Sequence, residues 1–370
     1  MTTDTYHPAS SLRWESVTSA EAGFDPMRLE AAVALAQSSS VGQSEGDIET
    51  MTRLGCAGEA YTEIIGPMRN RGDHNGMIVR HGRIVAEWGD VRRVDMAFSI
   101  TKSFLSTVAG LAWKEGLFDF DTPVRHSVPD LFDEGMNRDI TWEHLLRQTS
   151  AWEGVLWDKP AWAVNKDRVA AGAIGPTNIK PGAAFEYNDV RVNLLAFALL
   201  RVWGRPLPQI LRERVMGKIG ATTTWDWFGY KNSWVNLSGQ WVQSVSGGGH
   251  WGGGLHISTR DLALWGLLTL REGLWNGVEM LSRDWIQREI SPGEANPAYG
   301  FVNWNIRPST DGQPRRPVFY TTGSTRGDAG TTAQNSVTID RDRDIMIVLR
   351  WMNGDRLEEV TRSILRSADD

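Results

Sequence analysis

A serine and a lysine three residues apart are the first candidates for chemistry in this 370-residue chain. They lie in the segment Met96-Ala97-Phe98-Ser99-Ile100-Thr101-Lys102-Ser103-Phe104-Leu105, where an extended apolar stretch passes into a helical pattern. Residues i and i+3 of a helix share one face, with Cβ atoms roughly 5–6 Å apart, so Lys102 can reach the hydroxyl of Ser99. A lysine in an apolar pocket loses its charge more readily, and it can then take the proton of a serine nucleophile. Free N–H groups at a helix start can stabilise the oxyanion that forms when such a serine attacks a carbonyl.

The spacing alone also fits a helix-capping serine followed by a surface lysine. Two observations favour the chemical interpretation. Among all the lysines in the sequence, only Lys102 has a serine three residues before it. The helix that begins here is apolar, with residues repeating at helical spacing up to Gly116.

The bulk composition predicts an ordinary globular protein with one large domain or two smaller ones. A net charge of −6 argues against nucleic acid binding, which is typical of chains with an excess of basic residues. The single cysteine, Cys56, cannot form an intrachain disulfide, so we expect a cytosolic protein in which Cys56 is a small apolar core residue. The first residues lack the pattern of a signal peptide, and the longest apolar run, 194–200, is too short to span a membrane.

The order of predicted elements favours an α+β fold. Residues 76–80 and 83–88 are predicted to form a hairpin of two strands, and strand patterns return at 299–304, 335–340 and 344–351. Residues 140–290 are predicted to be mostly helices and long loops. We therefore expect an antiparallel sheet built from both ends of the chain and flanked by helices, with a mostly helical region inserted. The predicted boundaries are 1–118 with 291–370 for the sheet domain and 119–290 for the inserted domain.

Several helix boundaries can be predicted from capping residues. A helix is expected to start at Pro26, another after Thr141 as its N-cap, and another after the capping box Ser258–Asp261. The apolar helix at 192–203 is expected to end at Gly204, and residues 357–365 are expected to form a closing helix.

Other candidate residues surround a predicted cleft. Tyr187 precedes the apolar helix, and its hydroxyl could relay protons, ionising more easily beside an ammonium, or simply pack in the core. The run Gly247-Gly248-Gly249-His250-Trp251-Gly252 matches a dinucleotide-binding pattern, but no strand–turn–helix unit surrounds it, so we interpret it as a cleft loop. Most of the 18 tryptophans are expected in the core, and the others could line a cleft.

No metal site or cofactor is expected from the sequence, because no histidine pair has helical spacing with a carboxylate. The segment Gly323–Thr331 lies between two strand patterns. It is predicted to form either an edge strand with a glycine-rich bend or a plain hairpin loop.

Taken together, three segments occur in an order that resembles the serine hydrolases of the class C β-lactamase and penicillin-binding-protein superfamily. These are Ser99-x-x-Lys102, then Tyr187-x-Asp189, then the glycine-rich strand edge near 323–330. The flanks at 98–104, 140–154 and 252–263 are also similar, and the likeness extends over about 70–355. Within the superfamily, the branch with esterases and 6-aminohexanoate-dimer hydrolases looks closest.

The resemblance implies that Ser99 is the acylated nucleophile, that Lys102 is its base, and that Tyr187 shares the proton transfers. It also implies an oxyanion hole made by the Ser99 N–H and a backbone N–H near 327–332. We expect Asp189, Trp157, His250, Trp251 and Gly330 to contact substrate. The implied function is a serine hydrolase of amides or esters acting on a small molecule. An acyltransferase with the same acyl-enzyme and a catalytically silent ligand-binding module are the alternatives. We expect no nucleic acid or membrane partner, and the oligomeric state is not predicted.

Two residues depart from the superfamily pattern. The second motif usually ends in asparagine, and here Asp189 takes that place. The third motif of β-lactamases starts with a lysine that recognises the substrate carboxylate, and residues 232–370 contain no lysine. Thr325-Arg326-Gly327 and Gly330-Thr331-Thr332 both remain candidates for that motif. These departures favour less acidic substrates. A carboxylate at Asp189 is expected near the acyl pocket, where it would repel carboxylates and attract ammonium groups, unless it merely caps the helix that begins near Val190.

Overall fold

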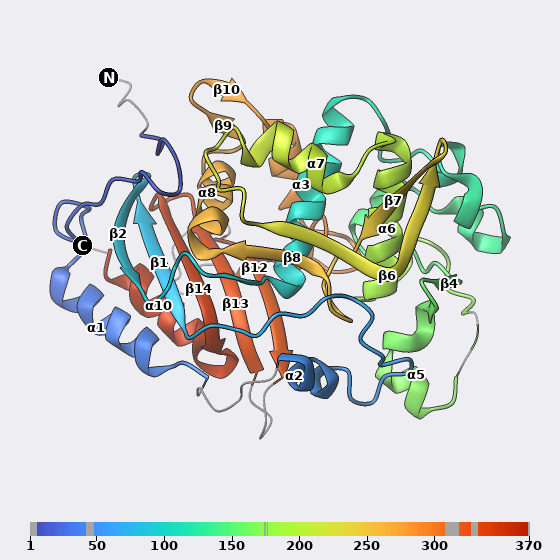
Figure 1. Ribbon diagram of the computed structural model, residues 1–370, viewed down its shortest axis with the longest axis horizontal. Coiled ribbons are helices and arrows are strands. Elements are labelled where there is room, and N and C mark those ends of the chain that lie inside the picture. The colour runs from blue at the N-terminus through green and yellow to red at the C-terminus, as the bar shows by residue number, and fades with distance from the viewer. Residues whose placement is uncertain are drawn as a thin grey trace.

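Strands from both ends of the chain form one antiparallel sheet in the computed structural model, which describes residues 6–41, 48–173, 175, 177–307, 318–326 and 332–368 (Figure 1). The sheet has six strands in the order β11-β12-β13-β14-β1-β2. Their bounds are β1 Asn75–Arg80, β2 Arg83–Trp88, β11 Asn305–Arg307, β12 Val318–Arg326, β13 Thr332–Asp340 and β14 Ile345–Asn353. The predicted α+β class and the discontinuous sheet are therefore confirmed.

The N-terminal hairpin joins the C-terminal strands by pairing with the last strand of the chain. β1 runs antiparallel to β14, with Asn75 opposite Arg350 and Arg80 opposite Ile345. The predicted turn between β1 and β2 is made by His81 and Gly82, both with positive φ. β14 is an apolar run that is buried along nearly its whole length, because helices cover both faces of the sheet.

The alternation of side chains along β14 divides the core into two layers. Ile345, Ile347 and Leu349 point to the face covered by α1 (Pro26–Ser38) and α10 (Leu357–Arg366). Met346 and Val348 point to the opposite face, which is covered by α8 (Thr259–Leu270). This placement differs from the predicted domain boundaries, which assigned α8 to the inserted region, because α8 buries its apolar side chains against the sheet.

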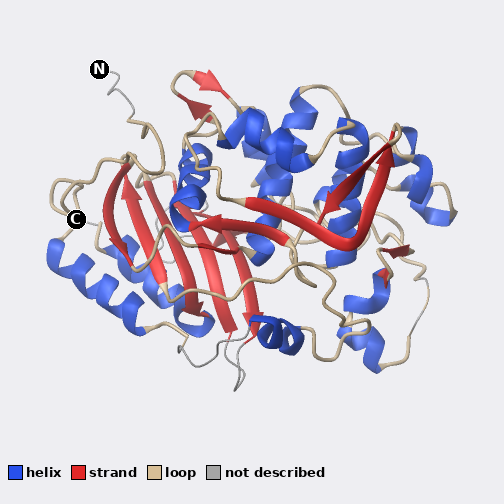
Figure 2. Ribbon diagram, viewed as in Figure 1, coloured by secondary structure: helices blue, strands red, loops and turns tan. Residues whose placement is uncertain are grey.

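The remaining helices include α3, near whose start the candidate serine and lysine lie, and α6 and α7, which contact α3 (Figure 2). Their bounds are α2 Ile48–Gly55, α3 Thr101–Lys114, α4 Trp142–Leu146, α5 Lys166–Ala170, α6 Asp189–Trp203, α7 Leu207–Leu211 and α9 Arg283–Glu289. Within the described residues, no helix is both long enough and apolar enough to cross a membrane.

A second sheet takes three of its four strands from the region that was predicted to be mostly helical. Its strand order is β3-β8-β6-β7, with β3 Val94–Met96, β6 Asp226–Leu237, β7 Gln240–Val245 and β8 Gly254–Ser258. Two short hairpins complete the strands: β4 Val155–Leu156 with β5 Lys159–Pro160, and β9 Leu274–Trp275 with β10 Val278–Glu279. The prediction missed the β6–β7 hairpin.

Most of the predicted element boundaries are confirmed. Asp25 caps the helix that starts at Pro26, Thr141 forms a capping box, and Ser258 accepts the N–H of Asp261 at the start of α8. Gly204 ends α6 in a left-handed conformation. The strand predicted at 299–304 is wrong: Tyr299 and Trp304 form only an isolated bridge that closes a turn.

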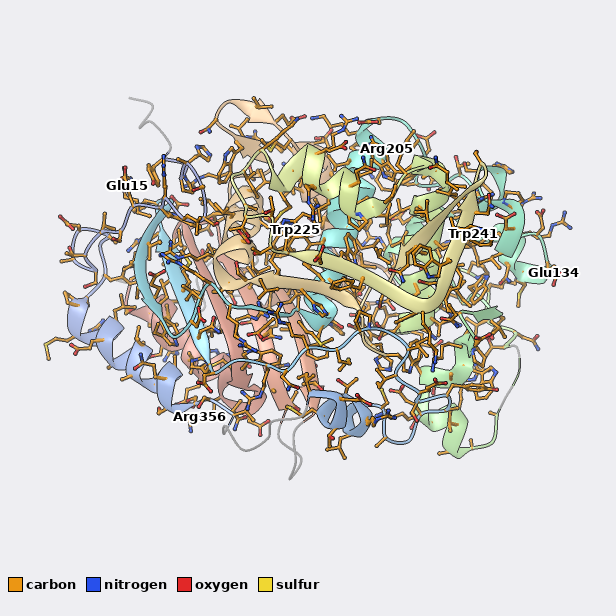
Figure 3. All side chains as sticks on the ribbon, viewed as in Figure 1. Glu15, Glu134, Arg205, Trp225, Trp241 and Arg356 are labelled. Carbon is orange, nitrogen blue, oxygen red and sulfur yellow. The ribbon has the colours of Figure 1, made fainter. Side chains whose placement is uncertain are left out.

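Tryptophans mostly occupy the core, as predicted, and Trp225 is an example with 1% exposure. Trp241 in the β6–β7 hairpin is 67% exposed (Figure 3). The most exposed tryptophans, Trp234 and Trp241, therefore lie on this hairpin, whereas the half-buried Trp304 lines the cleft that contains Ser99, as the sequence allowed.

Glu289 is the last residue of α9, and it is buried, with 3% exposure. It accepts a hydrogen bond from Asn303 Nδ2 at 2.6 Å. Burial raises its pKa to about 7, although contacts with Ser106, Arg341 and Asn303 oppose the rise. Because the folded pKa lies above the unfolded value, the folded state loses stability as pH rises through 4.5 toward 7 and beyond.

We therefore expect Glu289→Gln to stabilise the fold at pH 8.5 relative to wild type by up to about 3 kcal/mol, and by much less at pH 5. Denaturant unfolding of both proteins at the two pH values measures the difference. A stability difference that is the same at both pH values would contradict a buried carboxyl that must ionise.

Candidate active site

The chain places Ser99 on a short 3-10 helix, η1 (Phe98–Ile100), between β3 and α3. The backbone N–H of Ala97 donates to the carbonyl of Leu255 in β8 at 2.8 Å, which fixes the start of this turn. Lys102 lies in the first turn of α3 and is 2% exposed. Its Nζ is 2.8 Å from Ser99 Oγ, so the contact predicted from the i, i+3 spacing is present.

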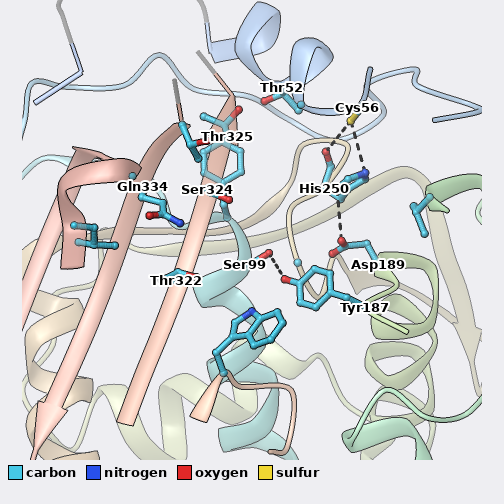
Figure 4. Close-up of a pocket in the computed structure, with 18 of the residues that line it drawn as sticks. Thr52, Cys56, Ser99, Tyr187, Asp189, His250, Thr322, Ser324, Thr325 and Gln334 are labelled. Atoms are coloured by element: carbon cyan, nitrogen blue, oxygen red, sulfur yellow. Dashed lines mark hydrogen bonds and ion pairs between the residues drawn. The ribbon is translucent and has the colours of Figure 1, made fainter. Parts of the chain in front are cut away.

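The Tyr187 hydroxyl donates a hydrogen bond to Ser99 Oγ at 2.8 Å (Figure 4). Its ring stacks on Trp304 at 5.7 Å and packs edge-on against Tyr299. Burial, together with the negative charge of Asp189, raises the pKa of the Tyr187 hydroxyl above its usual value. The phenol is therefore held protonated, which corrects the expectation that a nearby ammonium would make it ionise more easily.

Asp189 is the first residue of α6, and its carboxylate is buried against two cationic partners. Its Oδ1 accepts from Lys102 Nζ at 2.6 Å, and its Oδ2 lies 3.5 Å from His250 Nδ1. Although burial acts in the other direction, the charges of Lys102 and His250 lower the pKa of Asp189. The helix cap is instead Asn188, whose side chain accepts the N–H groups of Val190 and Arg191. Because its charge is matched internally and it is 5% exposed, Asp189 does not present a free carboxylate to substrate.

His250 extends this chain of ionic contacts. Its Nε2 lies 2.7 Å from Glu59 Oε2 and 3.6 Å from Cys56 Sγ. Burial opposes the charged ring, but Asp189, with the contacts to Cys56 and Glu59, raises the pKa of His250 well above its usual value. Lys102, Asp189, His250 and Glu59 thus form a continuous series of charged groups leading away from Ser99.

A cleft of about 970 Å³ opens above these groups. Ser99, Tyr187, Asp189 and His250 line it, together with residues of β12, the α2 segment and the start of α10. This volume is within the range of sites that enclose a small organic ligand. The cleft therefore gives substrate-sized access to the hydroxyl of Ser99.

Two of the predicted substrate contacts, Trp157 and Trp251, are described by the structure and do not line the cleft. Trp157 packs edge-on against Phe197, and Trp251 is fully buried behind the ring of His250. Their indole rings serve the core, which corrects their prediction as cleft residues. Gly330 lies outside the described residues.

The third segment approaches Ser99 through Gly323 in β12. A Cβ at position 323 would lie 2.0 Å from the Ala97 carbonyl oxygen and 2.8 Å from Ser99 N, so only glycine allows this approach. Both sequence candidates for the third motif lie farther along the chain. Thr325 and Arg326 end β12, Thr332 starts β13, and residues 327–331 are not among those described. Within the predicted segment, residues 323–326 belong to β12, which lies between β11 and β13, and the two predictions for the rest of the segment fall on residues outside those described.

Gly248 contacts the candidate site, and the sequence analysis did not assign this position a role of its own. A Cβ there would lie 2.1 Å from Asp189 Oδ1 and 2.4 Å from Lys102 Nζ. The glycine-rich loop is thus pressed onto the Lys102–Asp189 pair. The run of three glycines was the signal, although spacing alone did not say which group the loop covers.

The comparisons with known proteins agree with this architecture. Residues 75–366 match the sequence model of the family described as Beta-lactamase. Because that match spans most of the chain, the protein belongs to the Beta-lactamase family.

Several solved structures have the same fold as this chain. A β-lactamase/D-alanine carboxypeptidase from Pseudomonas syringae aligns with a TM-score of 0.59 at 17% identity, covering 92% of this chain and 100% of that one. A Bacillus anthracis protein provisionally named a 6-aminohexanoate-dimer hydrolase gives a TM-score of 0.57 at 15% identity, covering 98% and 89%. An octameric penicillin-binding protein homologue from Pyrococcus abyssi gives 0.54 at 18% identity, covering 79% and 73%. At these identities, the likeness establishes the fold.

Proposed function

We propose that this protein is a serine hydrolase that cleaves an amide or ester bond through a covalent acyl-Ser99 intermediate. The observation that carries the proposal is the position of Ser99 Oγ, which lies 2.8 Å from both Lys102 Nζ and Tyr187 OH at the base of the cleft. A nucleophile within hydrogen-bond reach of a base, with that base oriented by a third group, is the arrangement that nucleophilic catalysis needs. Here the orienting group is Asp189, 2.6 Å from Lys102 Nζ.

Before acylation, the ammonium of Lys102 must release one proton to solvent, because in its paired, charged form it cannot act as a base. The neutral amine then takes the hydroxyl proton while Ser99 Oγ bonds to the substrate carbonyl carbon. Asp189 stabilises the ammonium that forms, as a buried carboxylate does for the cationic base in other serine hydrolases. The bond to the leaving group then breaks, and the protonated phenol of Tyr187 donates its proton to that group while taking one from Lys102. Water reverses these transfers during deacylation, so both side chains return to their starting states.

The developing oxyanion needs two hydrogen-bond donors. One is the N–H of Ser99 in the first helical turn, where N–H groups lack partners within the helix. For the second we propose the backbone N–H of Ser324, because Gly323 brings β12 against η1 and, among the described residues, β11 pairs with β12 only at Val318 and Phe319. This assignment places the donor a few residues before the segment suggested by the sequence.

Replacing Gly323 should therefore damage catalysis more than folding. We expect Gly323→Ala to lower kcat on the order of 100-fold, the usual cost of misplacing one oxyanion donor. Gly239→Ala is the matched control, because it strains a surface turn with φ +92 and meets no atom within 4 Å. Steady-state kinetics with thermal unfolding separates the two effects. Equal kcat values for Gly323→Ala and wild type would contradict the assignment of β12.

The composition of the cleft supports substrates without a carboxylate beside the scissile bond. Apart from Asp189, whose charge is matched by Lys102 and His250, the described acidic side chains that line it are Glu59, Asp355 and Glu358, while the cationic ones are Lys166 and His250. No lysine follows residue 231, so the lysine of the β-lactamase third motif has no counterpart. These features favour a neutral or cationic amide or ester over a β-lactam.

A substrate panel tests this function and separates it from acyl transfer. The panel holds p-nitrophenyl esters, short linear amides and nitrocefin, each assayed with and without added small alcohols or amines. The proposal predicts turnover of esters or amides in water alone, with little turnover of nitrocefin. Turnover only with an added acceptor would indicate a transferase, and no reaction with any carbonyl compound would favour a ligand-binding module.

A further inference from the structure

A second group of chemically active side chains lies on the same cleft, away from Ser99. Cys56 follows the end of α2, Glu59 lies in the turn after it, and His250 belongs to the glycine-rich loop. All three line the cleft, and one ligand-type atom from each lies within 4.8 Å of the others. Figure 4 shows Cys56 and His250 facing each other across this wall.

The spacing of these atoms is close to that of a tetrahedral metal centre. Zinc binds sulfur at about 2.3 Å and imidazole nitrogen at about 2.0 Å, so the two ligand atoms are separated by about 3.5 Å at tetrahedral angles. The distance from Cys56 Sγ to His250 Nε2 is 3.6 Å. Glu59 Oε2 lies 2.7 Å from the same nitrogen. To bind the same ion, this oxygen would have to move away from the nitrogen by about half an ångström.

The other nitrogen of His250 has the partner that metal-binding histidines usually have. Its Nδ1 lies 3.5 Å from Asp189 Oδ2, and Asp189 is nearly fully buried. A carboxylate in this position fixes the imidazole ring and leaves Nε2 directed at the ion. The contact between His250 and Asp189 is a second observation, separate from the proximity of Cys56, Glu59 and His250 to one another.

We infer that Cys56, Glu59 and His250 form a binding site for Zn²⁺ or a similar divalent cation. The thiolate and the carboxylate offset the charge of the ion, and the imidazole completes a three-residue set whose fourth position faces the cleft. Lys166 Nζ, 3.9 Å from Glu59 Oε1, donates to the Gly55 carbonyl and lies beside the other carboxylate oxygen. The bound ion would join the α2 segment to the glycine-rich loop across one wall of the cleft.

Cobalt(II) titration of the reduced, metal-free, untagged full-length protein tests the site directly. A thiolate bound to Co²⁺ gives a near-ultraviolet charge-transfer band, and Cys56 is the only cysteine in the sequence that can produce it. We expect the band to saturate at one equivalent and to disappear when Zn²⁺ is added, because zinc binds such sites more tightly than cobalt. We also expect Zn²⁺ to raise the thermal unfolding midpoint, since it binds the folded state. The absence of the band in the folded wild-type protein overturns the inference without any variant.

Variants then assign the ligands. Glu59→Gln and His250→Gln should weaken cobalt binding by at least about 10-fold, and Asp189→Asn should weaken it by about 10- to 100-fold as an outer-shell change. His126→Ala, which changes an exposed histidine, is the control and should bind like wild type. A band of unchanged affinity in both Glu59→Gln and His250→Gln would show that Cys56 binds cobalt without this site, and it would overturn the inference. Because these titrations require no substrate, their outcome is independent of the proposed hydrolase activity.

Discussion

Ser99→Ala is expected to lose turnover by about 10⁴-fold or more while keeping its fold, because no other group replaces the hydroxyl that becomes acylated. The substitution removes one oxygen atom at the cleft and leaves Lys102 paired with Asp189 at 2.6 Å. The lost hydrogen bonds should cost roughly 1–2 kcal/mol of folding stability. kcat on the best ester of the panel and the thermal unfolding midpoint measure both effects.

Ser106→Ala is the matched control for this experiment. Ser106 is a buried serine on α3, the helix that follows η1, and it does not line the cleft. It should lose stability without a large loss of kcat. If Ser99→Ala kept more than a few per cent of wild-type turnover in a preparation free of contaminating esterase, Ser99 would not be the nucleophile.

Lys102→Arg is expected to be nearly inactive, with kcat reduced by about 10³-fold or more, even though it preserves the positive charge. A guanidinium does not release its proton in the pH range of a protein, so it cannot act as the base. It is also bulkier, and Lys102 Nζ lies in a site so tight that a Cβ at Gly248 would be 2.4 Å away. Titrating kcat from pH 6 to 10 checks whether any pH restores turnover.

Lys159→Arg offers a matched buried lysine for comparison. Lys159 is 3% exposed and donates to the Glu63 carbonyl at 3.0 Å, away from Ser99. That variant should keep turnover within a few-fold of wild type. An active Lys102→Arg enzyme would mean that proton transfer from Ser99 uses another group, for which Tyr187 would be the candidate.

Local signals were enough to predict four strands of the main sheet, β1, β2, β13 and β14. The β1–β2 hairpin has a turn glycine between two short strands, β14 is a continuous apolar run, and the helices carry recognisable capping residues. The β6–β7 hairpin was not predicted, because its pairing register shifts between Gly229 and Trp234, where polar residues interrupt the alternation of apolar and polar side chains. A strand with such an irregularity resembles a loop when only its side-chain pattern is considered.

In the candidate site, too, contacts between residues close in the sequence could be predicted, and contacts between distant residues could not. Ser99 and Lys102 are neighbours on one helical turn, so their contact follows from sequence spacing. Tyr187 lies 88 residues from Ser99, and only the order of motifs connected the two. The contact between Cys56 and His250 spans 194 residues, and no local pattern records it. The expectation that no metal site exists considered helical spacing alone and therefore did not test such long-range groups.

The most direct test of the account is mass spectrometry of the protein after rapid quenching during turnover of an activated ester. The account predicts a mass increase equal to one acyl group, mapped by proteolysis to the peptide containing Ser99, which decays at the rate of hydrolysis. The adduct should be absent in Ser99→Ala. Turnover without a detectable adduct at any quench time, or an adduct on a different residue whose decay matches turnover, would contradict the acyl-Ser99 mechanism.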